Sequence, residues 1–157
     1  MTTRKSVIVK DFGKVFEEYP AVGAITPGML IEYTSAGKVQ PHSTSGGNAL
    51  KMVALEDELQ GKTISEAYAA EDQVQCWIPQ RGGIALMRIA NGQTIAVGDL
   101  LQSGGSGYLN KYVADAAESN GDVTVYPEQI VGQALEAVDM SDSSAADPDG
   151  LIEVRIY

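Results

Sequence analysis

The alternation of apolar and polar residues between closely spaced glycines and prolines constrains the fold of this chain more than any other feature. In QVQCWIP (residues 73–79), Val74, Cys76 and Ile78 share one face of an extended chain, and LIEVRIY (residues 151–157) alternates in the same way. Side chains of a β-strand point to opposite faces with a period of two, so short alternating segments bounded by turn residues are typical of strands. The chain is therefore predicted to be all-β.

Many short strands at this spacing favour a compact β-barrel or a β-sandwich, and the pattern leaves both open. A length of 157 residues fits one domain. We expect a single β-rich domain over residues 21–157 and an extended N-terminal arm over residues 1–20. One short helix is expected within Lys62–Asp72, because good helix formers follow Ser65, a residue type that caps helices.

Two segments of the chain are similar at a constant offset of 70 residues. ITPGMLIEYTSAGKV (residues 25–39) matches IAVGDLLQSGGSGYL (residues 95–109) at an isoleucine, two glycines and a leucine. The tripeptide ALE follows each segment, at residues 54–56 and 134–136. Because these landmarks keep their order, we interpret them as an internal duplication that produces two similar half-units.

The glycine-rich sequence SGGSG (residues 103–107) could cradle a phosphate or turn the chain. A phosphate cradle needs successive backbone N–H groups and usually a helix that begins directly after them. Strand-like sequence flanks this segment on both sides, and the first copy carries YTSAG (residues 33–37) at the same place. We therefore predict a β-hairpin turn, in which glycine adopts a positive φ at little cost.

Residues that could support catalysis or metal binding are few. His42 is the single histidine and Cys76 the single cysteine, and no nucleophile motif lies near His42. We interpret His42 as a solvated loop residue. Cys76 is interpreted as a small buried core residue, with a reactive or intermolecular thiol as its alternative. The acidic loop over residues 139–149 lacks the spacing of an EF-hand. The sequence thus predicts no enzyme, no cofactor and no metal site.

Charge is distributed unevenly along the chain. The net charge is −10, yet the first 14 residues hold four bases and one acid, so this segment carries +3 and the remainder −13. An acidic body is repelled by nucleic-acid phosphates, which disfavours direct nucleic-acid binding. No apolar segment approaches the roughly 20 residues that cross a bilayer, and no signal peptide is recognised, so we expect a cytosolic folding environment and no membrane partner.

The basic segment also contains a β-prone sequence, SVIVKDF (residues 6–12). One hypothesis is that Met1–Lys14 is flexible in the free protein and adds as a strand to the sheet edge of a partner. The alternative is that Val7–Phe12 forms the first strand of the protein's own sheet. The candidate contact residues of the arm are Arg4, Lys5, Val7, Val9, Lys10 and Lys14.

Four segments taken together resemble the small head decoration (cement) proteins of tailed bacteriophages. They are VALEDELQGKTISEAYAAEDQVQCWIPQRGG, NGQTIAVGDLLQSGGSGYL, VGQALEAVD and IEVRIY, within residues 53–157, and the likeness reaches from about Ile25. The resemblance implies a compact β-rich domain that docks on the outside of an assembled capsid and carries no catalytic residues. Proteins of this kind commonly sit at three-fold or quasi-three-fold positions and brace neighbouring subunits.

From this resemblance we expect a virion structural protein on the outer capsid surface, made in the cytoplasm of the bacterial host. Its expected partners are the major capsid protein and further copies of itself, with a trimer favoured. The alternatives are another phage structural component, such as a neck or tail protein, and a hydrolase of unknown substrate that uses His42 or an acidic pair.

Overall fold

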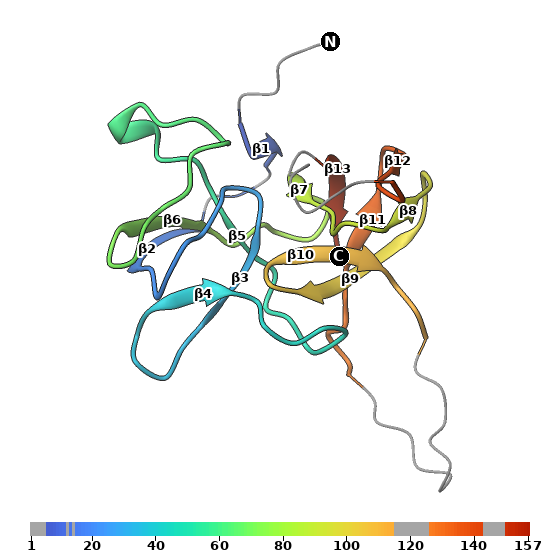
Figure 1. The fold of residues 1–157 in the computed structure, drawn as a ribbon, viewed down its shortest axis with the longest axis horizontal. Coiled ribbons are helices and arrows are strands. Elements are labelled where there is room, and N and C mark those ends of the chain that lie inside the picture. The colour runs from blue at the N-terminus through green and yellow to red at the C-terminus, as the bar shows by residue number, and fades with distance from the viewer. Residues whose placement is uncertain (1–5, 12, 14, 115–125, 143–149) are drawn as a thin grey trace, which may run out of the picture.

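The computed structural model describes residues 6–11, 13, 15–114, 126–142 and 150–157 (Figure 1). Strand content is 43%, well above the average of about 20–25% in soluble proteins. Among the described residues the helical structure is confined to η1 (Glu58–Gln60), a single 3-10 turn. The all-β prediction is confirmed.

The first half-unit, residues 16–77, is a five-stranded antiparallel sheet with the strand order β2-β6-β5-β3-β4. Its buried side chains, among them Ile31, Met52, Val74 and Cys76, form a core within this half-unit. The strands are β2 (Phe16–Pro20), β3 (Leu30–Tyr33), β4 (Val39–Pro41), β5 (Met52–Ala54) and β6 (Gln73–Trp77).

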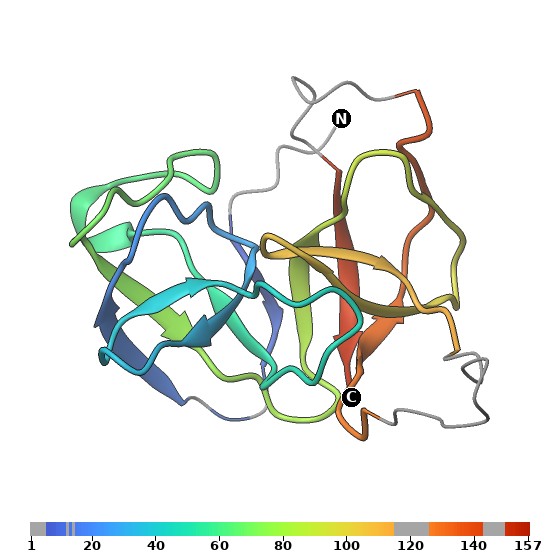
Figure 2. The same cartoon turned by 60° about the horizontal axis from the view of Figure 1, so that its bottom comes forward.

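The second half-unit, residues 84–156, lies beside the first (Figure 2). It forms five strands of a six-stranded sheet in the order β7-β13-β11-β9-β10, and β1 is added outside β7. The strands are β1 (Ile8–Lys10), β7 (Ile84–Arg88), β9 (Leu100–Gly105), β10 (Tyr108–Lys111), β11 (Ile130–Ala134) and β13 (Leu151–Ile156), with β8 (Thr94–Ile95) and β12 (Val138–Asp139) paired separately.

The half-units share apolar packing at their junction. Leu30, Val53 and Trp77 of the first half-unit belong to the same buried cluster as Leu86 and Val154 of the second. In the described residues neither sheet closes into a barrel. The two edges of the first sheet approach each other at a bridge between Ala21 and Val39, and Ile89 and Leu109 form the corresponding bridge in the second half-unit.

The strand orders confirm the duplicated half-units, because β2-β6-β5-β3-β4 and β7-β13-β11-β9-β10 are the same arrangement. The registers repeat as well. In the β3–β4 hairpin Ile31 lies opposite Pro41, and in the β9–β10 hairpin Leu101 lies opposite Lys111. Both members of the second pair follow the first at the offset of 70 that the sequence shows.

Individual backbone hydrogen bonds are repeated in the two copies, at the matching glycines and ALE tripeptides. The N–H of Gly28 donates to the carbonyl of Ala54 at 2.8 Å, and the N–H of Gly98 donates to that of Ala134 at 2.9 Å. Both glycines have a positive φ, 86° and 93°. The matching glycines therefore lie in matching turns, and each turn is hydrogen-bonded to the alanine of the ALE tripeptide in its own copy.

The glycine-rich segment turns the chain between β9 and β10, as predicted. Gly105 pairs with Tyr108, and Ser106 and Gly107 between them have φ values of 54° and 80°. Two central residues with positive φ match the twist of a two-residue β-hairpin. The helix that a phosphate cradle would require does not follow, since Tyr108 begins β10.

The prediction of a helix within Lys62–Asp72 is wrong. Ile25 and Tyr68 exchange backbone hydrogen bonds at 3.2 and 2.8 Å, and the hydroxyl of Tyr68 donates to the carbonyl of Leu55 at 2.9 Å. The backbone N–H of Thr63 donates to Oε2 of Glu66 at 2.7 Å. These long-range and side-chain partners take up groups that a helix would pair locally, and they override a weak intrinsic propensity.

Both strands within the expected N-terminal arm pair with the body of the protein. β1 is antiparallel to β7, and all five residues of β2 pair with β6. For Ile8–Lys10 the structure thus shows the alternative in which this segment is a strand of the protein's own sheet. That the N-terminal residues contact a capsid stays a prediction.

Candidate functional site

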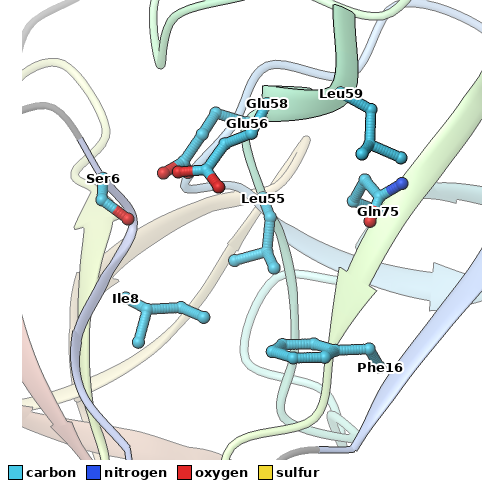
Figure 3. Close-up of a pocket in the computed structure, with 8 residues that line it drawn as sticks. All are labelled: Ser6, Ile8, Phe16, Leu55, Glu56, Glu58, Leu59 and Gln75. Atoms are coloured by element: carbon cyan, nitrogen blue, oxygen red, sulfur yellow. The ribbon is translucent and has the colours of Figure 1, made fainter. Parts of the chain in front are cut away.

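A groove with a volume of about 440 Å³ lies between β1 and the first half-unit. Figure 3 shows Ser6 and Ile8 on one side and Leu59, Gln75 and Phe16 on the other. We call this feature the N-terminal groove. Its lining residues are Ser6, Ile8, Phe16, Leu55, Glu56, Glu58, Leu59 and Gln75.

One wall of the N-terminal groove is held in place by a buried carboxylate. The backbone N–H of Val7 donates to Oε2 of Glu56 at 3.0 Å, and the N–H of Leu86 donates to the carbonyl of Val7 at 2.8 Å. Val7 is fully buried. The segment that leads into β1 is therefore fixed to the first half-unit by a side chain and to the second by its backbone.

The opposite wall rises from the 3-10 turn η1. Asp57 caps this turn by accepting a hydrogen bond from the N–H of Gln60 at 3.3 Å, and Gly61 ends it in a left-handed conformation. The turn projects Leu59, which is 85% exposed, beside the groove. Leu59 is thus an exposed apolar side chain at the rim of the groove.

The polar side chains that line the groove are acidic or neutral. In Figure 3 the carboxylates of Glu56 and Glu58 lie at one end, above the apolar side chains of Leu55 and Ile8. The described residues contain no cluster of three or more histidine, cysteine or acidic side chains suited to hold a metal ion. A site of this composition can bind an extended apolar segment that also carries positive charge.

The predicted contact residues are only partly accounted for. Val7 is buried and faces the core, Val9 is 44% exposed, and Lys10 lies opposite Ile84 in the β1–β7 pair. Arg4, Lys5 and Lys14 lie outside the described residues. No sequence pattern indicates the groove, although Glu56 lies in the ALE tripeptide that marks the duplication.

His42 is not a solvated loop residue, and that prediction is wrong. The residue is 2% exposed, with Nε2 at 2.9 Å from the carbonyl of Asn48 and Nδ1 at 2.8 Å from Oγ of Ser103. A carbonyl can only accept, so Nε2 carries a proton and donates it to Asn48. The carboxylate of Glu32 also lies near this end of the ring, with Oε2 at 3.5 Å from Nε2.

This Ser103–His42 pair has the composition of a hydrolase site without its access. Ser103 is fully buried, and its Oγ also accepts a hydrogen bond from the N–H of Gly105 at 3.2 Å. The backbone of His42 meanwhile joins the half-units, because its carbonyl accepts from the N–H of Gly107 at 3.1 Å. We interpret the pair as a structural hydrogen-bond network in which a substrate cannot reach the hydroxyl.

Cys76 is buried in the core of the first half-unit, as predicted. Burial raises the pKa of its thiol to about 12, and the nearby carboxylate of Glu17 acts in the same direction. A neutral thiol in such a position has little nucleophilic character. Cys76 therefore packs as a small apolar residue.

Comparisons with known proteins show a likeness at the level of the fold. No protein-family model matches the chain, and no curated protein matches it. Among solved structures the chain is similar to the N base of head fiber gp8.5 in bacteriophage phi29, with a TM-score of 0.55 and 14% identity, over 92% of this chain and 95% of that one. At this level of identity the likeness concerns the fold. Membrane-spanning helices are absent from the described residues.

Proposed function

We propose that this chain is a virion structural protein that binds the outer surface of an assembled phage capsid and stabilises contacts between major capsid subunits. The observation that carries the proposal is the shared fold with the head fiber base of phi29, which extends over 92% of the chain. The motifs that resemble head decoration proteins give further support, since that resemblance depends on the sequence and not on the fold.

The charge and surface of the protein fit this role. A body that carries −13 outside its first 14 residues suits the outside of a particle better than its DNA-filled interior, where phosphates would repel it. The N-terminal groove offers apolar contact area next to carboxylates, a combination that complements a basic capsid segment. Several copies, most simply a trimer, would add their affinities when they bridge neighbouring subunits.

The proposal is tested with capsids of the phage that encodes the chain, assembled without it. Purified protein is added and the particles are imaged by electron cryomicroscopy at subnanometre resolution. We expect added density on the outer surface at three-fold or quasi-three-fold positions, and capsids that resist heating better than undecorated ones. Density at the neck or tail of native virions, or no density at all, would contradict the proposal.

A second candidate function is the base of a fiber attached to the head, which the name of the phi29 structure favours. The two functions differ in what lies beyond the domain. Micrographs of native virions should show density that ends at the domain for a decoration protein and continues outward for a fiber base. Neither function requires a catalytic residue.

A further inference from the structure

The internal duplication assigns each strand of one half-unit a counterpart in the other. The pairs Glu18–Gln75 and Leu86–Glu153 occupy the same place, because the carbonyls of Gln75 and Glu153 accept hydrogen bonds from the N–H groups of Leu55 and Leu135, at 2.8 and 2.9 Å. This makes β2 the counterpart of β7. Each is the outermost of the five duplicated strands in its half-unit.

The outer edge of β7 is covered by β1. Ile8 lies opposite Ala85, Lys10 lies opposite Ile84, and the N–H of Leu86 donates to the carbonyl of Val7 at 2.8 Å. Ala85 and Leu86 are accordingly buried. The second half-unit thus carries a sixth strand with a short, apolar and basic sequence, IVK (residues 8–10).

Apart from the bridge between Ala21 and Val39 just beyond its end, the corresponding edge of β2 pairs with no strand in the described part of the chain. Phe16 is 46% exposed and Glu18 is exposed, whereas their counterparts in β7 are more buried. The N–H of Ile78 donates to the carbonyl of Val15 at 3.0 Å, and the carbonyl of Gln75 is bonded to Leu55. Because hydrogen-bonded and non-hydrogen-bonded pairs alternate in an antiparallel ladder, the backbone groups of Phe16 and Glu18 point away from β6, toward this open edge.

We propose that the open edge of β2 pairs with an extended segment of a capsid subunit in which apolar and basic residues alternate. The inference rests on the proposed function and identifies the surface and the chemistry of the contact. The added strand would occupy in the first half-unit the place that β1 occupies in the second. Backbone hydrogen bonds supply its affinity, and alternate side chains supply its register.

The charges near the edge determine which charge the partner segment should carry. β2 contributes Glu17 and Glu18, and Phe16 connects its edge to the N-terminal groove, which contains Glu56 and Glu58. A basic segment is attracted to this surface. A second copy of this chain that paired through its own β2 would place Glu17 and Glu18 against the same residues, and like charges opposite each other destabilise a strand pair. The favoured occupant is therefore a segment of a different protein.

The test compares two substitutions at one position. Glu18→Pro removes an N–H that points to the open edge and leaves the β6 ladder intact, since proline is tolerated on an edge strand whose N–H faces outward. Glu18→Ala is the matched control, because both variants lose the carboxylate and its 2.7 Å hydrogen bond from Gln75, but only the proline variant loses the N–H. Equal melting temperatures of the two variants would show that both are folded.

Binding of wild type and both variants to undecorated capsids is then measured by co-sedimentation. We expect Glu18→Pro to bind at least about tenfold more weakly than Glu18→Ala, because several copies multiply the loss of each backbone hydrogen bond. Hydrogen exchange gives a second measurement. The amides of Phe16 and Glu18 should exchange fast in the free protein and become protected on capsids. The Leu86 amide, which donates to the carbonyl of Val7, should be protected in both states.

Each outcome separates the two proposals. If wild type binds and Glu18→Pro binds equally well without new protection at Glu18, the open edge is not the contact, and the proposed function stands. If wild-type protein does not bind capsids, the proposed function fails and this inference fails with it. Self-association of the wild type in sedimentation velocity that Glu18→Pro abolishes would overturn the inference in favour of a second copy as the occupant.

Discussion

The backbone N–H of Val7 and the carboxylate of Glu56 form a buried hydrogen bond 3.0 Å long across 49 residues of sequence. It joins the segment before β1 to the segment that follows β5, and β1 in turn pairs with β7. This contact determines where the N-terminal strand lies and forms one wall of the N-terminal groove. Its energetic weight follows from burial, because an unpaired polar group in the interior loses its hydration without compensation.

Glu56→Ala should destabilise the protein by about 1–3 kcal/mol, because it leaves the buried N–H of Val7 without an acceptor. Glu56→Gln keeps an acceptor oxygen at the same place and should cost less. Urea unfolding followed by Trp77 fluorescence measures both free energies. Equal stability of Glu56→Ala and wild type would mean that the hydrogen bond contributes nothing to folding.

Deletion of residues 1–14 should lower the melting temperature, since it removes β1 and the buried side chain of Val7. Burial of a valine alone contributes roughly 1.5–3 kcal/mol. Deletion of residues 1–5 is the control, because it removes Arg4 and Lys5 and keeps every described contact of β1. An unchanged melting temperature after the longer deletion would instead support an N-terminal arm that is independent of the body.

The matched glycines provide an internal comparison. Gly98→Ala should cost about 1–2 kcal/mol, the penalty for a left-handed backbone at a residue with a side chain. Gly28→Ala should cost more, because a Cβ there would also lie 3.0 Å from the carbonyl oxygen of Leu86, whereas the nearest atom at Gly98 is 4.0 Å away. Gly23→Ala, with no atom within 4 Å, is the control for a neutral change. Thermal unfolding should show the largest loss of stability for Gly28→Ala, a smaller loss for Gly98→Ala and the smallest for Gly23→Ala.

Cys76 should not react with a thiol reagent at pH 8 while the protein is folded, because burial raises its pKa to about 12 and little thiolate forms. Labelling should become rapid in denaturant. Cys76→Ala should cost on the order of 1 kcal/mol through a small cavity and leave capsid binding unchanged. Fast labelling of the native protein, or a disulfide-linked species isolated from virions, would show that the thiol is accessible.

Stability should fall at acid pH in part through Asp99. A hydrogen bond from Lys111, at 2.8 Å, and one from the N–H of Ala96, at 2.9 Å, lower the pKa of Asp99 below its ordinary value of 3.8. A carboxyl whose pKa is lowered by folding stabilises the native state above its unfolded pKa, and this contribution is lost as the pH falls through the folded pKa.

The acid limb is measured by urea unfolding at neutral pH and at successive values below about pH 4, near the unfolded pKa of aspartate. Asp99→Asn should show a shallower loss of stability there than wild type, and Lys111→Met, which removes the first partner, should be shallower as well. An acid limb of Asp99→Asn that coincides with that of wild type would show that this carboxyl does not contribute.

The sequence by itself determined the features that depend on local pattern. Alternation in segments such as residues 73–79 indicated strands because the side-chain period of a strand is two, and the positive φ of Gly107 followed from turn chemistry. The duplication was also readable, since Gly28 and Gly98 must adopt the same left-handed turn in both copies. These properties involve a few neighbouring residues, so the sequence carries them directly.

Only the tertiary structure decided which distant groups meet. Tyr68 pairs with Ile25 in place of the helix expected around it. His42 is buried against Ser103, 61 residues away, and does not lie in solvent as expected. The same ALE glutamate has two roles: Glu56 accepts from Val7, whereas Glu136 accepts from the N–H of Glu153 at 2.9 Å. A residue's burial and hydrogen-bond partner depend on the packing of whole half-units, and no local pattern contains that information.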